Sequence, residues 1–259
     1  MPLTQVIVLA VVQGVTELLP VSSTAHLVVI PWIFHWPDPG LTFDVALHMG
    51  TLLAVVLYFW RLWIEIVLRN RRLFGFLILA TFPAGLAGLF LEHYVETTLR
   101  SPYVIAASTI GIALVMAWSE WVTKTRLELQ DVSLADSMVI GAAQALAVVP
   151  GVSRSGITIA AGLFRDLRRD TAARFSFLLA TPIIAGAGLK KALEMRHVGL
   201  APEMRLPFLL GMAVAALVGY GVISFFIRYL QTRTLKIFIY YRIIFGIIVL
   251  VLAILSRPR

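Results

Sequence analysis

Long apolar stretches separated by short polar loops make up most of the chain. A helix needs roughly 20 apolar residues to cross a bilayer, and six stretches meet that length: 41–60, 73–91, 102–121, 171–189, 206–227 and 235–255. Each is predicted to be a transmembrane helix, because a helix satisfies its own backbone hydrogen bonds in a medium that offers none.

Two further apolar stretches are interrupted by a proline and a hydroxyl-rich turn. The first joins 2–19 to 25–34 across Pro20, and the second joins 134–149 to 157–164 across Pro150. In each case the second helix is too short to span, so both stretches are predicted to be re-entrant helical hairpins. Irregular backbone at membrane depth is tolerated only where protein buries it or a watery cavity meets it. We therefore expect both breaks to face one interior site.

The order of elements is a hairpin, three spans, a second hairpin and three more spans. Shifting the chain by 131 residues aligns Gln13 with Gln144 and Ser22 with Ser153, which supports an internal duplication. Because three is odd, the second copy is expected to be inverted in the membrane, an architecture typical of transporters. We predict an all-α polytopic membrane protein with one domain, 1–259, made of inverted repeats at about 1–125 and 126–259.

Composition and charge support this assignment. Apolar residues make up 59% of the chain and the mean hydropathy is +0.90, well above a soluble domain. The net charge of +8 comes from basic residues in short loops, which favours a role in topology over nucleic-acid binding. If the basic loops 61–72, 124–126, 165–174 and 228–236 are cytoplasmic, both termini lie outside. The absence of cysteine excludes disulfides and thiolate chemistry.

The first break carries a carboxylate. Gln13 and Glu17 are four residues apart and share one helix face. Glu17 lies in the last turn, where the helix dipole disfavours a negative charge, so it calls for a compensating cation. A structural ion pair with Arg154 is one interpretation; a catalytic or metal-binding role is favoured, because ionisable groups at this depth usually serve a substrate path.

A serine and a histidine follow Pro20. Ser22 or Ser23 is suited to cap the next helix, and His26 lies one turn after Ser23. The spacing lets the imidazole reach the serine hydroxyl, the pairing that activates a serine nucleophile. A capping serine beside an unrelated, hydrogen-bonded histidine fits equally well.

The second break provides an anion site. Gly151, Ser153, Ser155 and Gly156 are expected to expose backbone amides at a helix N-terminus. Arg154 lies among them, and a guanidinium can form two parallel hydrogen bonds to the oxygens of one phosphate. Outside the breaks, His48 on the span 41–60 has two interpretations of equal weight, a cavity-lining residue or a histidine packed against another helix.

The motifs QGVTELLPVSSTAH and PGVSRSG together resemble the bacterial undecaprenyl-diphosphate phosphatase family, known for bacitracin resistance. FDVALHMGTLLAVVLYFW, FRDLRRDTAARFSFLLATP and the chain length extend the resemblance over nearly the whole sequence. It implies hydrolysis of undecaprenyl diphosphate to undecaprenyl phosphate and phosphate, recycling the lipid carrier of cell-wall synthesis. The implied location is the bacterial cytoplasmic membrane, with an active site open to the periplasm or outside.

The resulting hypothesis assigns roles to both breaks. Glu17, Ser23, His26 and Arg154 are the predicted catalytic residues, with either Ser23 or a water as nucleophile. Substrate binding is assigned to Arg154 and to the residues Gln13, Ser22, Thr24, Gly151, Ser153, Ser155 and Gly156.

Two further expectations concern ions and partners. A divalent cation, Mg²⁺ or Ca²⁺, is expected to bridge Glu17 and the phosphates, because such ions prefer oxygen ligands. The partners are the lipid substrate and the membrane, and a homodimer is compatible with the sequence. The rival function is a polyprenyl-phosphate or anion transporter, which the same inverted architecture suits.

Overall fold

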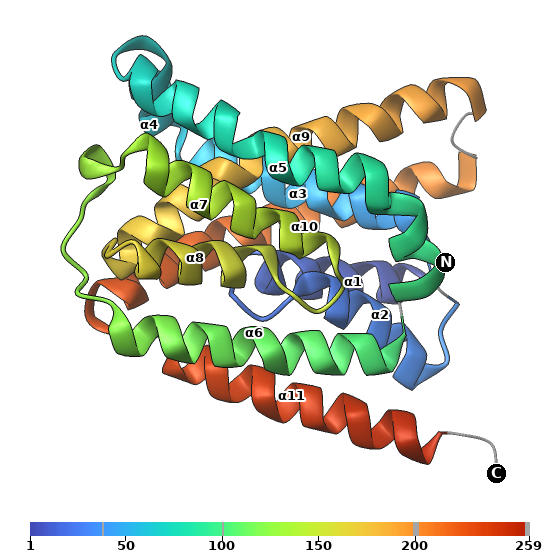
Figure 1. Cartoon of the computed structure of the whole chain (residues 1–259). Coiled ribbons are helices and arrows are strands. Elements are labelled where there is room, and N and C mark those ends of the chain that lie inside the picture. Colours follow the sequence, from blue (N-terminus) through green and yellow to red (C-terminus); the bar gives the residue numbers. More distant parts are fainter. Residues whose placement is uncertain (38, 100, 199–201, 257–259) are drawn as a thin grey trace.

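The computed structural model describes the chain except 38, 100, 199–201 and 257–259, and the side chains at 41, 92, 93, 96, 97 and 195–198 are likewise outside the description. The described part is helical, as predicted, with eleven α-helices (Figure 1). They are α1 Leu3–Thr16, α2 Ser23–Phe34, α3 Leu41–Tyr58, α4 Trp60–Leu68, α5 Arg71–Tyr94, α6 Pro102–Val122, α7 Leu134–Ala145, α8 Arg154–Phe164, α9 Arg169–Val198, α10 Pro202–Thr232 and α11 Lys236–Leu255.

Five of the predicted spans correspond to single helices that are long and apolar enough to cross a membrane: α5, α6, α9, α10 and α11. The predicted span 41–60 differs. It ends at Tyr58, and the chain bends by 72° between α3 and α4, so this pair makes a sixth span only if it is counted as one. Helix α4 occupies part of the segment 61–72 that the sequence analysis assigned to a loop.

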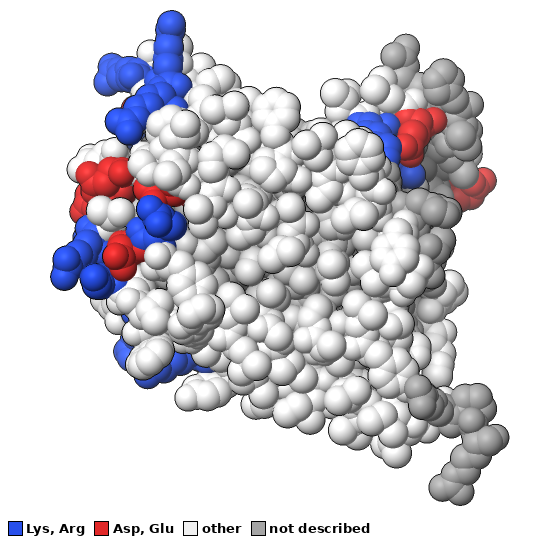
Figure 2. All heavy atoms as spheres, viewed as in Figure 1, with Lys and Arg blue, Asp and Glu red and all other residues white. Residues whose placement is uncertain are grey.

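Charged side chains gather at the two ends of the helix bundle and leave a broad uncharged surface between them (Figure 2). The four basic loops named above lie at one end, and the N-terminus and the end of α11 lie at the other (Figure 1). Exposed leucine, isoleucine, phenylalanine and tryptophan side chains occur on nearly every helix. Such a surface suits lipid contact and is unusual for a soluble protein.

Polar contacts connect the basic loops to one another. Arg169 at the start of α9 donates to both carboxylate oxygens of Glu120 on α6, at 2.6 to 3.0 Å. The Glu120 carboxylate also accepts the backbone N–H of Leu235, at 2.8 Å, just before α11. The backbone N–H of Lys124 donates to the Asp166 carboxylate at 2.7 Å. These contacts connect the ends of α6, α8, α9 and α11 at the basic end of the bundle.

Two helix pairs are interrupted near the middle of the bundle. Helix α1 runs inward from the end that carries the N-terminus, and α2 returns toward that end after a break at Pro20 (Figure 1). Helix α7 starts at the opposite end, continues as the 3₁₀ turn Leu146–Val148, breaks at Pro150 and returns as α8. Proline lacks a backbone N–H and cannot continue the helix at either place.

Close helix packing surrounds the breaks. Helix α10 packs against α3 and α1, α11 against α6, and α5 against α7. The contact of α5 with α7 depends on Gly141, because a β-carbon added there would overlap the backbone of Ala80. Backbones that approach through small residues are typical of helix contacts in membranes.

We expect Gly141→Ala to destabilise the protein by about 1–3 kcal/mol, since overpacking forces the two backbones apart. The matched control is Gly75→Ala on the same helix pair, where a β-carbon meets nothing within 4 Å. Thermal unfolding in detergent should show a lower midpoint for Gly141→Ala and no fall for Gly75→Ala. Equal midpoints for the two variants would contradict this account of the α5–α7 contact.

Candidate active site

Glu17 is the centre of the polar cluster at the first break. It follows the last turn of α1, and only 6% of its surface is exposed. Its Oε2 accepts hydrogen bonds from Gln13 Nε2 at 3.1 Å and from the hydroxyl of Ser23. Its Oε1 forms an ion pair with Arg154 Nη2. The carboxylate thus connects the helix before the first break to the helices after both breaks.

His48 on α3 completes the surroundings of Glu17. Its Nε2 lies 3.3 Å from Glu17 Oε2, and its Nδ1 lies 2.7 Å from the backbone oxygen of Asp44. Both ring nitrogens therefore face oxygen acceptors, an arrangement that suits the doubly protonated ring. Of the two interpretations offered for His48, the structure supports the cavity-lining one, because His48 and Asp44 both line the site cavity.

The second break has a left-handed backbone at Gly151 and at Ser153. Gly151 has φ +91°, and a β-carbon there would overlap the side chain of Ser108 on α6. Ser153 caps α8 by accepting the N–H of Gly156 at 3.1 Å. The Gly156 amide is therefore occupied by the cap, contrary to the expectation that it is open to an anion. Arg154 is the first residue of α8, so its side chain starts beside the positive end of that helix.

The two breaks are held to each other by hydrogen bonds to backbone oxygens. The Ser155 hydroxyl donates to Leu19 O at 3.1 Å. Arg242 on α11, which is fully buried, donates from Nη1 to Pro20 O at 3.3 Å and from Nη2 to Gly151 O at 2.8 Å. The Arg242 donors satisfy carbonyl groups of both breaks, where the helical hydrogen-bond pattern is interrupted. Leu19 O also accepts the backbone N–H of Val21, at 2.8 Å.

His26 does not pair with Ser23 as the spacing predicted. Its Nδ1 lies 2.7 Å from Ser22 O and its Nε2 lies 2.7 Å from the Tyr241 hydroxyl. A neutral ring fits these partners, donating from Nδ1 and accepting at Nε2. The ring also stacks on Phe245 at a centroid distance of 4.3 Å. The packing of α2 against α11 turns the imidazole away from the hydroxyl, and Ser23 hydrogen-bonds to Glu17 instead.

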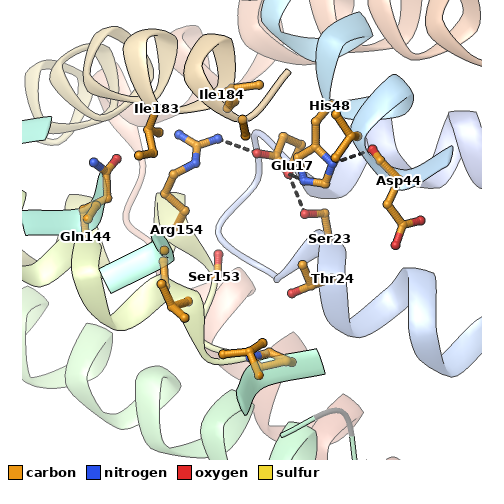
Figure 3. A pocket seen from close by; sticks show the side chains of 18 of the residues that line it. Glu17, Ser23, Thr24, Asp44, His48, Gln144, Ser153, Arg154, Ile183 and Ile184 are labelled. Carbon is orange, nitrogen blue, oxygen red and sulfur yellow. Dashed lines mark hydrogen bonds and ion pairs between the residues drawn. The ribbon is translucent and has the colours of Figure 1, made fainter. Parts of the chain in front are cut away.

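One cavity of about 640 Å³ joins both breaks. Figure 3 shows Glu17, Ser23, His48 and Arg154 directed toward one another in it. Of the predicted site residues, six line the cavity: Glu17, Ser22, Ser23, Thr24, Ser153 and Arg154. The other five are buried and are not among the lining residues: Gln13, His26, Gly151, Ser155 and Gly156.

Sequence reasoning did not assign several polar residues of this region to the site, and three of them matter most. Asp44 and Gln144 line the cavity, and Arg242 holds both breaks. Each had a signal in the sequence. Arg242 interrupts an otherwise apolar span, Gln144 aligns with Gln13, and Asp44 lies one turn before His48. An ionisable residue inside an apolar span marks a functional or structural site by default.

The expected divalent cation does not fit Glu17 as the side chains are arranged. Both carboxylate oxygens are occupied by hydrogen-bond donors. Two of those donors disfavour a nearby cation, because Arg154 is positively charged and His48 is positively charged when it is protonated. Among the described residues, no group of three or more histidine, cysteine, aspartate or glutamate side chains is placed to hold a metal ion.

The fold and the site define a class of protein. It is a multi-span membrane protein with a carboxylate, a hydroxyl and a guanidinium around an interior cavity. The family described as bacitracin resistance protein BacA matches residues 6–248. The chain is 47% identical to a protein of Moorella thermoacetica named undecaprenyl-diphosphatase, over 99% of this chain and 100% of that relative. A protein of the same name from Desulforudis audaxviator is 48% identical, over 96% and 97%. The chain belongs to the BacA family.

We predict that Arg154→Lys lowers phosphatase turnover by about a hundredfold, the usual effect of losing one positioned donor to a transition-state oxyanion. An ammonium group cannot contact Glu17 and an anion through two coplanar nitrogens. Arg168→Lys is the matched control, since Arg168 forms an exposed pair with Glu128. Steady-state phosphate release by the two variants measures the effect, and wild-type turnover in Arg154→Lys would remove the residue from the site.

Proposed function

We propose that the protein is an undecaprenyl-diphosphatase, which hydrolyses undecaprenyl diphosphate to undecaprenyl phosphate and phosphate. The names of relatives that are 44–48% identical along almost the whole chain support this activity. The observation that carries it structurally is the Glu17 carboxylate, hydrogen-bonded to the Ser23 hydroxyl and paired with Arg154 in one interior cavity. This set supplies a base, a nucleophile and an anion receptor.

In the proposed reaction, the Ser23 oxygen attacks the terminal phosphorus and its proton passes to Glu17. The bond from that phosphorus to the bridging oxygen breaks, and undecaprenyl phosphate leaves with the bond's electron pair. Water then hydrolyses the phosphoserine and releases phosphate. Ser23 is the first residue of α2, so the positive end of that helix favours an anionic oxygen there. Direct attack by a water that Glu17 activates is the alternative.

Arg154 supplies the charge that phosphoryl transfer needs. In the free protein its Nη2 is paired with Glu17, which keeps both charges neutralised at membrane depth. When the substrate binds, the guanidinium shares its donors between the carboxylate and the phosphate oxygens. The carboxylate is then less strongly neutralised, which makes it a better base for Ser23.

The two histidines have different proposed roles. His48, beside Glu17 and exposed over 22% of its side chain, contributes positive charge at the cavity wall. His26 holds the carbonyl of Ser22 and the start of α2, and so acts as a positioning residue. The predicted acid-base role of His26 is thereby replaced by one that acts through the backbone of the first break.

The lipid tail is proposed to occupy the apolar wall of the cavity. This wall is formed by α5 and α9. It contains the small residues Ala84, Gly85, Gly88, Gly186 and Ala187 together with Ile183. An isoprenoid chain can enter between two helices here without crossing a polar surface. The apolar wall extends to Leu89, near the end of α5, and Lys190 on α9 is a charged residue at the edge of this lining.

Two architectural proposals follow. The pairs α1–α2 and α7–α8 are re-entrant hairpins of inverted repeats at about 1–125 and 126–259, supported by the opposite bundle ends from which α1 and α7 start (Figure 1). The cavity opens toward the periplasmic or outer side. This orientation is supported by the basic loops, which lie at the opposite end of the bundle from the N-terminus, because such loops are usually cytoplasmic.

Phosphate release by the purified full-length protein in detergent tests the activity. We expect inorganic phosphate to accumulate from undecaprenyl diphosphate and the lipid product to be undecaprenyl phosphate. Parallel reactions with and without a chelator show whether a divalent cation takes part. Uptake of intact lipid into vesicles without phosphate release would instead favour the transporter that the inverted architecture also suits.

Ser23→Ala tests the nucleophile. If Ser23 attacks phosphorus, the variant has no turnover, and rapid quenching of the wild type with terminally labelled substrate leaves label on the protein. Ser256→Ala, at the exposed end of α11, is the control. Residual turnover in Ser23→Ala together with the absence of trapped label would assign the attack to water and leave Glu17 as its base.

A further inference from the structure

Gln144 is a buried amide that no part of the described protein satisfies. It lies near the end of α7, lines the site cavity and is 2% exposed. Neither its Nε2 nor its Oε1 has a hydrogen-bond partner. Burying an amide without a partner costs free energy, and a polar side chain retained at that cost inside a binding cavity indicates a ligand contact.

Arg154 has an unpartnered nitrogen on the side of its guanidinium that faces Gln144. Its Nη2 is bound to Glu17, whereas its Nη1 is buried and has no partner. Figure 3 shows the guanidinium between Glu17 on one side and Gln144 on the other, with Ile183 drawn between the guanidinium and Gln144 in this view. The cavity therefore has unpartnered polar atoms next to the apolar wall, on Gln144 and on the outer nitrogen of the guanidinium that pairs with Glu17.

The two halves of the sequence explain why Gln144 lacks a partner. At the offset of 131 residues, Gln13 aligns with Gln144 and Glu17 aligns with Val148. Gln13 donates to the Glu17 carboxylate at 3.1 Å. Val148, which also lines the cavity, offers Gln144 no acceptor. The carboxylate that accepts the Nε2 hydrogen bond of the first glutamine belongs to the protein, although Gln13 Oε1 has no partner. The second glutamine has no such acceptor in the described part of the chain.

We propose that Gln144 Nε2 and Arg154 Nη1 form a second phosphate subsite, which holds the lipid-linked phosphate of the substrate while the terminal phosphate lies at Ser23. The inference rests on the proposed function and deepens it. The lipid-linked phosphate must lie beside the tail, and Gln144 adjoins the apolar wall formed in part by Ile183. Donors here neutralise the charge that develops on the leaving phosphate, and they select a diphosphate over a monophosphate.

The test is binding of undecaprenyl phosphate, the lipid product, to the full-length protein in detergent. We expect Gln144→Leu to weaken this binding at least tenfold and to raise the KM for undecaprenyl diphosphate by a similar factor. Gln144→Glu should weaken it further, because a carboxylate repels the phosphate. Gln231→Leu, at an exposed position at the end of α10, is the matched control and should behave as the wild type.

Thermal unfolding of the ligand-free variants separates a binding role from a structural one. Removing an unpartnered buried amide should leave the midpoint of Gln144→Leu unchanged or raise it. A fall in that midpoint, or wild-type affinity for undecaprenyl phosphate in both Gln144 variants, would overturn the proposal. Absence of phosphate release by the wild type would instead refute the proposed function, and it would leave the binding measurement to decide on the subsite.

Discussion

The structure depends on satisfying backbone carbonyl groups where two helices are interrupted inside an apolar bundle. Arg242 does this from α11, donating to Pro20 O, Gly151 O and Val152 O while none of its surface is exposed. A guanidinium is suited to the task because it has five donors in a rigid plane and stays charged. The dipoles of several carbonyl groups stabilise the positive charge of Arg242, as a carboxylate would. Arg242 therefore has a structural role at the breaks and takes no part in the reaction.

With the breaks fixed, a second guanidinium is free to serve the site. Arg154 and Glu17 come from opposite halves of the chain and neutralise each other at the centre of the bundle. An uncompensated charge at this depth would be expensive. The pair also responds to the substrate. In the proposed reaction a bound diphosphate competes with Glu17 for Arg154. Substrate binding thereby raises the basicity of Glu17, the group that receives the Ser23 proton.

The histidines illustrate the limits of spacing as a guide to contacts. His26 lies one turn after Ser23, and that spacing correctly places both on α2, yet the imidazole packs on Phe245 and hydrogen-bonds to Tyr241. His48 is distant in sequence, and it is the histidine beside Glu17. Helix periodicity defines which face a residue occupies, but the neighbouring helix decides which side chain that face meets.

The sequence by itself determined the helical class, most of the spans, the positions of both breaks and the chemical groups gathered there. Those features follow from hydrophobic runs, from prolines that cannot continue a helix and from the cost of polar groups in lipid. The tertiary structure decided the bend between α3 and α4, the partners of His26 and His48, and the clamp by Arg242. It also left Gln144 without a partner. These depend on contacts between helices far apart in the chain, for which local periodicity carries no information.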